Sequence, residues 1–333
     1  MNFSTKTEND FVMTAVANPN PVVEPPGDLL KETSIVVCTV DRMRDLEDCL
    51  KSLLPFSAAG AEIMVVNNGP HQTETSAIAA RHDAHVITES KRGVSRARNA
   101  GIRTARGSIV AFLDDDSFAA PNWLPLLVGP FHDPEVVAVV GSIAAQTLAD
   151  PVSQAFDSLH RAQFPASAKT LDGNTAQESF PMRSALVGNA NMAIRREAFD
   201  RFGFFDTRFG RGTRIGSGEE PDMLLRILLG GARIAVQPAA QIFHRHSTEW
   251  RSVRTWAFTS GCAHTAMLAK YFLGRRSLRG PIITYATSRL RREQTSTGPA
   301  PVKSAVPRLP FLLGSLYGPL AYLISGKDRA STS

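Results

Sequence analysis

Short apolar runs alternate with stretches of helical periodicity in the first part of the chain. Residues 34–39 form an apolar, β-branched run that predicts a buried strand. Apolar residues then recur at helical spacing as far as Leu54, with charges on the other face, and we expect Pro55 to end this helix. The same pattern predicts strands over 62–67, 84–88 and 108–113, and helices over 73–81 and 94–105.

This repeated alternation with short connections predicts an α/β fold. Its sheet should be mostly parallel with helices on both faces, and ligands bind such sheets at the carboxyl ends of their strands. Polar residues gather at these ends: Thr39-Val40-Asp41 after the first strand, Asn67-Asn68 after the second, and Asp114-Asp115-Asp116 after the fourth. The sequence therefore predicts a ligand site at one edge of the sheet.

The second part of the chain alternates less regularly. We expect a strand over 136–143, helices over 153–163 and 195–202, a flexible loop over 165–182, and short strands over 234–236 and 241–243. A glycine-rich stretch over 210–218 leads into a helix that opens at Glu219. The first 32 residues, which contain several prolines, are expected to form a flexible leader.

Composition narrows the range of partners without choosing among them. Of the 333 residues, 43% are hydrophobic and 20% are charged, which suits a globular core. The net charge of +6 favours anionic partners such as nucleotide diphosphates, nucleic acid or an anionic membrane surface. The three cysteines lie far apart without a CxxC pair, which indicates neither a zinc site nor a disulfide framework and fits a reducing cytosol. The leader lacks the apolar segment of a signal peptide, and no apolar run reaches the ~20 residues of an ordinary transmembrane helix.

Three adjacent carboxylates, Asp114, Asp115 and Asp116, follow the fourth predicted strand. Crowded carboxylates repel one another and need a cation or hydrogen-bond donors as compensation. Hard oxygen ligands suit Mg²⁺ or Mn²⁺, which bind substrate phosphates at the same time. The alternative is a solvated acidic turn or a helix cap.

Three further motifs carry polar groups of possible chemical use. Residues 93–101 open a helix with Gly93 and carry Arg96 and Arg98, which could receive a phosphate or form an ordinary exposed basic helix. Glu219 and Glu220 at a helix start could supply a general base or simply cap the helix. His244, after a short strand, could complete a metal shell or be structural.

The order of these motifs resembles the family 2 glycosyltransferases, which have a GT-A fold. The resemblance covers about residues 33–246. It rests on "SIVVCTVDRMRDLEDCLKSLL", "EIMVVNNGP", "RGVSRARNAGI", "GSIVAFLDDDSFAAPNWL", "GNANMAIRREAFDRFGFFD", "GEEPDMLLRILLGGARI" and "IFHRH". It implies a Rossmann-like nucleotide-sugar-binding half over 33–135, an acceptor-binding and catalytic half over 136–262, and a basic and apolar C-terminal extension over 263–333.

The resemblance also implies roles for individual residues. In the family's Asp-x-Asp motif, Asp114 would contact ribose and Asp116 the metal and diphosphate, with Asp115 sharing in this. The expected nucleotide-sugar site further comprises Thr39, Val40, Asp41, Arg42, Asn67, Arg98 and Asn99. The expected catalytic residues are Glu220 as the base, Glu219 and a supporting Asp222, and the acceptor-side residues are Asn191 and Asp206. His244 would lie near the metal, together with Asp114 and Asp116.

Two positions depart from the family's pattern. Asn67 stands where an aspartate usually contacts the nucleobase, and an amide both donates and accepts hydrogen bonds, unlike a carboxylate. Glu220 stands where an aspartate usually serves as the base, and its extra methylene extends the carboxylate and could shift the position of the acceptor.

The implied activity is that of an inverting glycosyltransferase with Mn²⁺ or Mg²⁺ as cofactor. It would move a sugar from a nucleotide-diphosphate sugar to a hydroxyl of a carbohydrate, lipid-linked or small-molecule acceptor, as in polysaccharide or glycolipid biosynthesis. Two alternatives are a metal-dependent sugar nucleotidyltransferase and a catalytically degenerate sugar-nucleotide-binding protein. Nucleic acid is not an expected partner, because the basic residues lack the interleaved aromatic residues of a stacking platform.

The C-terminal extension combines apolar residues with cations. Residues 309–324 are apolar but interrupted by prolines and glycines, and the cations upstream are Arg275, Arg276, Arg279, Arg289, Arg291 and Arg292. Such a segment could lie as an interfacial anchor on anionic lipid or pack as a helix on the domain or on a partner subunit. The expected location is the cytoplasm, with a peripheral position at the cytoplasmic membrane face as the open alternative.

Overall fold

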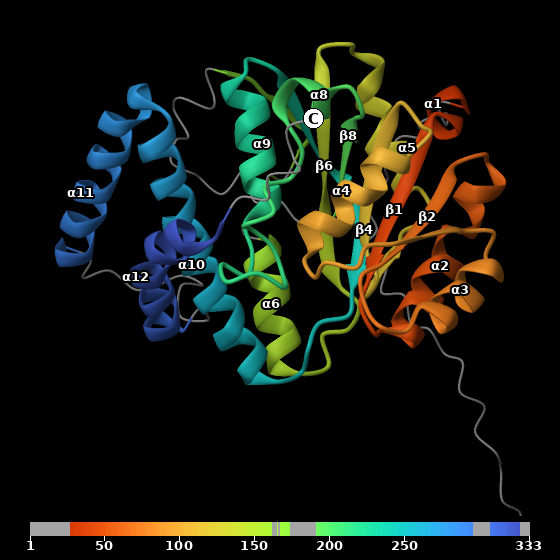
Figure 1. Ribbon diagram of the computed structural model, residues 1–333, viewed down its shortest axis with the longest axis horizontal. Helices are drawn as coiled ribbons and strands as arrows, with labels where there is room; N and C mark the ends of the chain where they lie inside the picture. Colours follow the sequence, from red (N-terminus) through yellow and green to blue (C-terminus); the bar gives the residue numbers. More distant parts are fainter. Residues whose placement is uncertain (1–26, 162–164, 166, 174–190, 296–306, 327–333) are drawn as a thin grey trace, which may run out of the picture.

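A nine-stranded sheet forms the centre of the protein. The computed structural model describes residues 27–161, 165, 167–173, 191–295 and 307–326. The strands run in the order β3-β2-β1-β4-β8-β6-β9-β5, and β7 pairs with β9 at the side of this path. Helices lie on both sides of the sheet (Figure 1). The predicted α/β class, with a mostly parallel sheet flanked by helices, is confirmed.

The first half of the sheet is parallel, as the alternation predicts. Its strands are β1 (Thr33–Thr39), β2 (Glu62–Asn67), β3 (His85–Thr88) and β4 (Ile109–Asp114). Its helices are α2 (Met43–Ala58), α3 (Gln72–Ala80) and α4 (Val94–Thr104). β1 pairs in parallel with both β2 and β4. The chain therefore leaves β1 first toward one side of the sheet and later toward the other, which opens a crevice at the carboxyl end of β1.

Consecutive residues of β1 contribute to two different cores. Val36 packs with α4 on one face of the sheet, while Ile35 and Val37 pack with α2 on the other. Side chains alternate between the faces of a strand, so a strand that is covered on both faces must be apolar at nearly every position. This explains why the run over 34–39 lacks an alternating polar pattern.

The second half of the sheet mixes directions. Its strands are β5 (Ser117–Ala119), β6 (Val136–Ala145), β7 (Lys169–Leu171), β8 (Met192–Arg195) and β9 (Arg233–His244). β8 runs antiparallel to both β4 and β6 and so joins the two halves. The short strands predicted over 234–236 and 241–243 are one continuous strand, β9, because a register shift at Gly141/Ser142 accommodates the residues between them.

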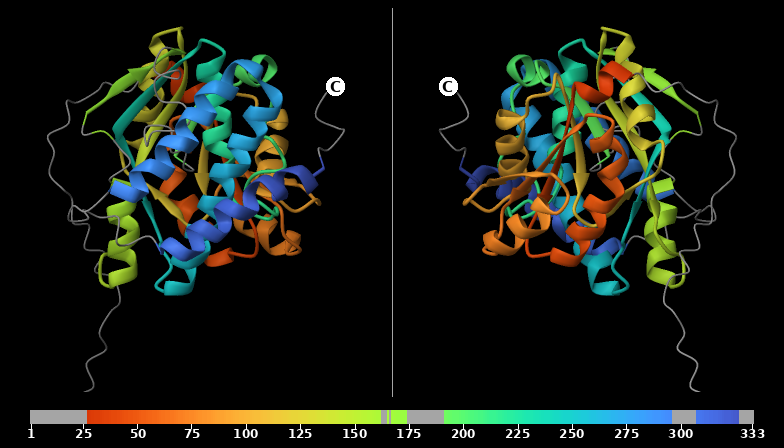
Figure 2. Two further views of the ribbon diagram at one scale, coloured as in Figure 1. Left: turned by 90° about the vertical axis from the view of Figure 1, so that its left-hand side faces the viewer. Right: turned by 90° about the vertical axis from the view of Figure 1, so that its right-hand side faces the viewer.

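The remaining helices of the described residues are α1 (Gly27–Lys31), α5 (Trp123–Val128), α6 (Pro151–Arg161), α8 (Ala198–Phe202), α9 (Glu219–Leu229), α10 (Trp250–Gly274), α11 (Arg279–Thr295) and α12 (Arg308–Ile324), with the 3-10 turns η1 (Gly129–His132) and η3 (Arg276–Leu278). Most of them surround the second half, while α1 precedes β1 and packs against α5 (Figure 1). The last three helices lie together on one side of the molecule (Figure 2, left). α10 runs without a break through residue 262, so the expected boundary at 262/263 falls inside a helix.

Several local expectations differ from the structure. The helix before Pro55 continues to Ala58, because Pro55 lies in its last turns and the following Phe56 is buried against Trp123. Residues 27–31 of the expected flexible leader form α1, whose Leu30 is buried in the core. β7 lies inside the loop expected over 165–182, whose residues 166 and 174–182 fall outside the described part of the chain. The helix expected over 195–202 begins only at Ala198, because the residues up to 195 pair in β8.

Candidate active site

The polar strand ends lie at one edge of the sheet, as predicted. In the pairing register, Thr39 of β1 stands beside Asn67 of β2, and Cys38 stands beside Asp114 of β4. Cys38 and Asp114, which are 76 positions apart in sequence, are thereby held at the crevice where the strand order reverses. The site is built on this edge.

The turn after β4 orients the three aspartates differently. β4 ends at Asp114, and Ser117 two residues after Asp115 already begins β5, where it pairs with His244 of β9. This pairing brings the His244 ring to Asp116, with 3.0 Å between His244 Nε2 and Asp116 Oδ1. The pairing of β5 with β9 thus places His244, from the second half of the sheet, beside the acidic turn that follows β4 in the first half.

Asp114, Asp116 and His244 form a cluster suited to a metal ion. Each offers one ligand atom, and these atoms all lie within 4.8 Å of one another. Asp116 is 5% exposed, and among the described residues only the His244 ring approaches its Oδ1. A buried carboxylate oxygen with so little compensation is costly unless a cation completes its coordination. Two carboxylates and an imidazole fit a divalent ion of the Mn²⁺ or Mg²⁺ type.

Neighbouring charges control the ionisation of this acidic turn. Burial opposes ionisation of Asp116, but the hydrogen bond and charge of His244, with Arg42 and Arg211, hold the pKa of Asp116 below its usual range. For Asp115, burial and the adjacent charge of Asp116 dominate and raise its pKa to about 7. The two neighbours therefore differ in charge near neutral pH, and Asp116 is the permanent anion.

Asp115 faces the scaffold rather than the cluster. Its Oδ2 accepts a 2.7 Å hydrogen bond from the Thr39 hydroxyl, and its Oδ1 lies 3.4 Å from the Arg42 guanidinium. Arg42 also forms an ion pair with Asp116. Thr39 and Arg42, both expected in the nucleotide pocket, thus hold the acidic turn in place, and Arg42 supplies a positive charge beside the cluster.

A single buried arginine links this turn to the base motif. Arg98 of α4 is 3% exposed, and its guanidinium lies 3.0 Å from Glu219, 2.8 Å from Glu220 and 3.4 Å from Asp114. The sequence left open whether Arg98 contacts a phosphate or belongs to an exposed basic helix; in the structure its guanidinium is buried against carboxylates. The acidic motifs from the two halves of the chain therefore meet at one cation.

Glu220 combines burial with remaining access to solvent. Burial and the charge of Glu219 raise the pKa of Glu220 to about 8, although Arg98 opposes the shift. About 13% of its side chain stays exposed, so a substrate hydroxyl can approach it. The neighbouring Glu219 has one buried oxygen, Oε2, without a hydrogen-bond partner. A carboxyl group whose pKa lies near the working pH can accept a proton efficiently.

Other expected site residues are engaged in scaffold contacts. Asp222 is fully buried and contacts Arg226, Lys270 and the Tyr271 hydroxyl. Asp206 shares the same Lys270, at 2.8 Å. These contacts hold the first turn of α9 in place. Both carboxylates are therefore already paired with cations of the protein.

Three amides that the sequence placed in the site also bind backbone. Asn99 bonds both to the amide and to the carbonyl of Phe205, at 3.0 and 2.9 Å. Asn191 donates to the carbonyls of Ser142 and Ala240 and accepts from the Trp123 indole, so it joins strands to α5. Asn67 bonds within its own turn, to the amide and carbonyl of Gly69.

The loops over the crevice carry the remaining polar residues. Val40 is half-buried and Asp41 is exposed, with a left-handed backbone φ of 57°. A Cβ on Gly69 would lie 2.6 Å from the Asp41 carboxylate, so the two turns lie close together here. Sequence reasoning did not single out Arg211, whose charge acts on Asp116 and whose carbonyl accepts from the Val94 amide. Its place in the glycine-rich stretch before Glu219 was the available signal.

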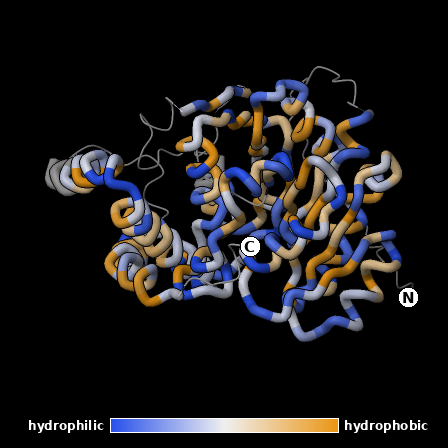
Figure 3. The backbone as a smooth tube through the Cα atoms, turned by 45° about the horizontal axis from the view of Figure 1, so that its top comes forward, coloured by the Kyte–Doolittle hydropathy of each residue, from blue (hydrophilic) through white to orange (hydrophobic). Residues whose placement is uncertain are grey.

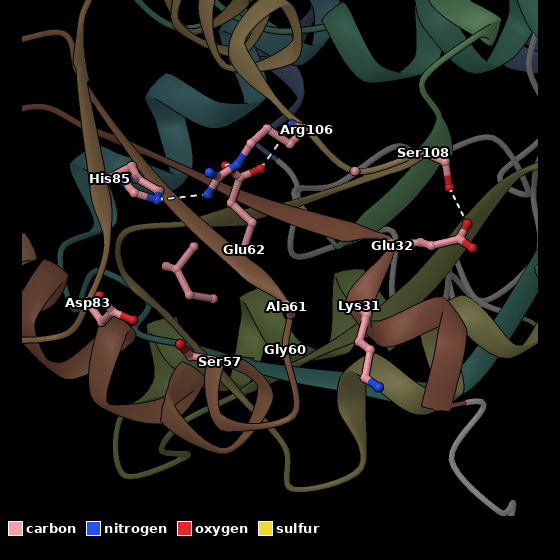
Figure 4. Close-up of a pocket in the computed structure, with 12 residues that line it drawn as sticks. Lys31, Glu32, Ser57, Gly60, Ala61, Glu62, Asp83, His85, Arg106 and Ser108 are labelled. Carbon is pink, nitrogen blue, oxygen red and sulfur yellow. Dashed lines mark hydrogen bonds and ion pairs between the residues drawn. The ribbon is translucent and has the colours of Figure 1, made fainter.

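A separate hollow of about 600 Å³ lies at the amino ends of the strands, far from these residues (Figure 4). Several of its polar groups are paired with one another: Arg106 lies 2.7 Å from Glu62 and 2.9 Å from His85, and Ser108 donates to Glu32. α/β sheets bind ligands at the carboxyl ends of their strands. The crevice with the aspartates is therefore the better candidate site.

Comparisons with known proteins agree with this geometry. The sequence profile described as "Glycosyl transferase family 2" matches residues 34–202, which include the acidic turn but neither Glu220 nor His244. A pre-mycofactocin glycosyltransferase from Mycobacterium tuberculosis is 27% identical over 253 residues, which span 74% of this chain and 49% of that protein. A glucosyl-dolichyl phosphate glucuronosyltransferase from Haloferax volcanii is 25% identical over 237 residues, 68% of this chain and 72% of that protein.

Solved structures show the same fold. A mannosyltransferase from Pyrobaculum calidifontis in complex with GDP-Man and Mn²⁺ superposes with a TM-score of 0.54 at 16% identity, over 88% of this chain and 86% of that one. The alignment with the mycobacterial relative spans about half of that relative's length. The family profile matches slightly more than half of the residues, and the chain therefore belongs to glycosyl transferase family 2.

Proposed function

We propose that the protein is an inverting glycosyltransferase that uses a nucleotide-diphosphate sugar and a divalent metal ion. One observation carries this proposal: the cluster of Asp114, Asp116 and His244 is joined to the Glu219-Glu220 pair by the buried Arg98. A site for a phosphate-binding cation thereby lies next to a site for a proton acceptor, which is the pairing that sugar transfer to a hydroxyl needs.

The donor side would be held by the sheet edge. Asp114, Asp116 and His244 would hold Mn²⁺ or Mg²⁺, which neutralises charge on the leaving nucleoside diphosphate. Arg42 and Arg211 add positive charge beside the diphosphate, since both already act on Asp116. The segments at residues 39–42 and 67–69 would line the nucleoside, with Asn67 and Asn99 shaping the pocket through their backbone contacts.

The acceptor side would be served by Glu220. In its ionised form its carboxylate removes the proton from the acceptor hydroxyl, whose oxygen forms a bond to the anomeric carbon. The bond from that carbon to the diphosphate oxygen breaks on the opposite face, so the anomeric configuration inverts in one displacement. Arg98 and Glu219 position the Glu220 carboxylate, while Asp206, Asp222 and Asn191 support the acceptor side through the scaffold.

The acceptor is proposed to be a hydroxyl of a carbohydrate, a lipid-linked molecule or a small molecule. The relative named as a dolichyl-phosphate sugar transferase supports the lipid-linked class. We place the reaction in the cytoplasm, at the membrane face for a lipid-linked acceptor, because the C-terminal helices expose apolar and basic side chains. The proposed reaction would belong to polysaccharide or glycolipid synthesis.

A panel of nucleotide-diphosphate sugars tests the donor class. With Mn²⁺ or Mg²⁺ present, transfer should release a nucleoside diphosphate, and chelation of the metal should stop it. Release of pyrophosphate instead would identify a nucleotidyltransferase, and no turnover of any donor would indicate a degenerate binding protein.

Glu220→Gln tests the base. We expect this variant to fold normally and to lose transfer by about 10²–10⁴-fold, since the amide cannot take the proton. The matched control is Glu197→Gln, at an exposed glutamate directly before α8, and this variant should keep full activity. Undiminished turnover of Glu220→Gln would remove this residue from the proposed role.

A further inference from the structure

The outward face of α12 is a continuous apolar stripe. Its large hydrophobic side chains are between 49% and 79% exposed: Leu309, Leu312, Leu313, Leu316, Leu320, Leu323 and Ile324. Spacings of three, four and one residues place them all on one side of a helix. Scattered exposed leucines are common, but seven on one helix face form a surface that normally meets a partner.

The opposite face of α12 fixes the helix against α10. A Cβ on Gly314 would lie 2.0 Å from the carbonyl oxygen of Phe258, and one on Gly318 would lie 2.2 Å from that of Cys262. The two backbones therefore touch, and α12 cannot rotate to bury its stripe. The two helices pack side by side among the C-terminal helices, whose hydrophobic positions appear in orange on the left of Figure 3.

The positive charge of the chain is concentrated in its C-terminal segment, which contains this stripe. Residues 250–333 contain 13 Lys and Arg but two Asp and Glu, a net charge of +11. The first 249 residues contain 24 Lys and Arg and 29 Asp and Glu, a net charge of −5. Helices α10 and α12 carry no acidic residue, and the exposed cations near their ends include Arg275, Arg276, Arg279 and Arg308.

We propose that the apolar stripe of α12 lies flat in the interfacial layer of an anionic lipid bilayer. Among the helices of the described residues, none is both long and apolar enough to cross a membrane. The 17 residues of α12 can insert one face, while the surrounding arginines meet anionic headgroups. A second copy of the chain is a poorer occupant, because a symmetric interface would bring two regions of charge +11 together.

This surface lies one helix layer away from the base motif. α12 packs on α10, and α10 in turn contacts the entry to α9, where a Cβ on Gly218 would lie 2.8 Å from Ala263. The C-terminal turn of α12 places Tyr322 against Phe209 and over the Arg208 guanidinium. A docked α12 would therefore hold the acceptor side next to the lipid, an orientation that extends the peripheral location of the proposed function and rests on it.

Vesicle flotation of the full chain tests the surface. The probes are vesicles of phosphatidylcholine alone and vesicles in which part of the lipid is phosphatidylglycerol. We expect binding to the anionic vesicles at low salt and much weaker binding to the neutral ones. Leu312→Glu/Leu316→Glu/Leu320→Glu should weaken binding at least tenfold, and each substitution among Arg275→Gln, Arg276→Gln and Arg279→Gln about fivefold. Leu54→Glu, at an exposed leucine of α2, is the matched control and should bind normally.

Three outcomes would overturn the proposal. They are no binding of the wild type to anionic vesicles at low salt, equal binding by the triple leucine variant, and a dimer that this variant dissociates without any vesicle binding. Metal-dependent turnover of a donor sugar is measured on the same preparations without lipid. A triple leucine variant that loses flotation but keeps this turnover separates the docking surface from the catalytic proposal.

Discussion

Two groups of carboxylates in this protein look alike in sequence and differ in chemistry. Asp114 and Asp116 at the sheet edge keep ligand atoms that converge with His244 on one position, where a metal ion could bind. Asp206 and Asp222 below α9 share Lys270, and each has a second cation of its own. The first group has Arg42 and Arg98 beside it and still keeps room for a cation from outside, whereas the second is fully paired with cations of the fold. Unused ligand capacity, rather than acidity, marks the functional group.

The sharpest way to break this comparison is Asp116→Asn. The amide keeps the shape but loses the negative charge that binds a cation, so transfer should fall by about 10²–10³-fold or more. Mn²⁺ binding, followed by paramagnetic resonance in the absence of donor, should weaken in parallel. The melting temperature should change little, because the amide oxygen can still accept from Arg42, whose side chain is 38% exposed.

The control for this prediction is Asp200→Asn, at an exposed aspartate of α8. It should leave metal binding and turnover unchanged. Normal Mn²⁺ binding by Asp116→Asn would show that the sheet-edge cluster is as self-sufficient as the group below α9.

Asp222→Asn should have the opposite signature. Removing this buried charge leaves Lys270 and Arg226 without a shared anion, which should lower the free energy of unfolding by about 3–5 kcal/mol. Chemical denaturation measures the loss, and turnover per folded molecule should stay within a few fold at low temperature. A stable but inactive Asp222→Asn would place this residue in the chemistry instead of the scaffold.

The pH dependence of transfer sharpens the role of Glu220. Its pKa is raised to about 8, so the ionised base becomes available only as the pH rises through that value. The value of kcat/KM should therefore increase across about pH 7 to 9 and then level off. Arg98→Gln removes the cation that opposes the shift, so the rise should move to higher pH. If kcat/KM of Arg98→Gln rises over the same pH range as that of the wild type, the electrostatic link between the two residues is contradicted.

Asn67→Asp should have the smallest effect. The carboxylate can still accept from the Gly69 amide but can no longer donate to the Gly69 carbonyl, at a cost of about 1 kcal/mol. A change in KM between donors with different nucleobases, measured against the wild type, would show whether this position also contacts the base. Equal KM ratios would limit Asn67 to shaping its turn.

The periodicity of the sequence determined the architecture of the first half. Strands buried on both faces must be apolar throughout, and their ends must be polar where a ligand binds, so 34–39, 62–67 and 108–113 were readable without tertiary information. The boundaries predicted from local sequence were wrong where packing against distant residues extended a helix or ordered a segment. Phe56 and Leu30 are buried by distant partners, and the helix and leader boundaries moved accordingly.

The tertiary structure alone decided which polar residues remain free to act. Asp222, Asn99 and Asn191 fit the motifs as well as Asp116 and Glu220 do, but strand pairing and helix packing supply them with partners. The meeting of Arg98 with Glu219 and Glu220, 121 residues or more along the chain, is likewise invisible to local patterns. The residue types determined which polar groups the site could contain. The three-dimensional contacts determined which of those groups remain free to bind a ligand, because a polar group can act on a ligand only if the fold has not already satisfied its hydrogen bonds.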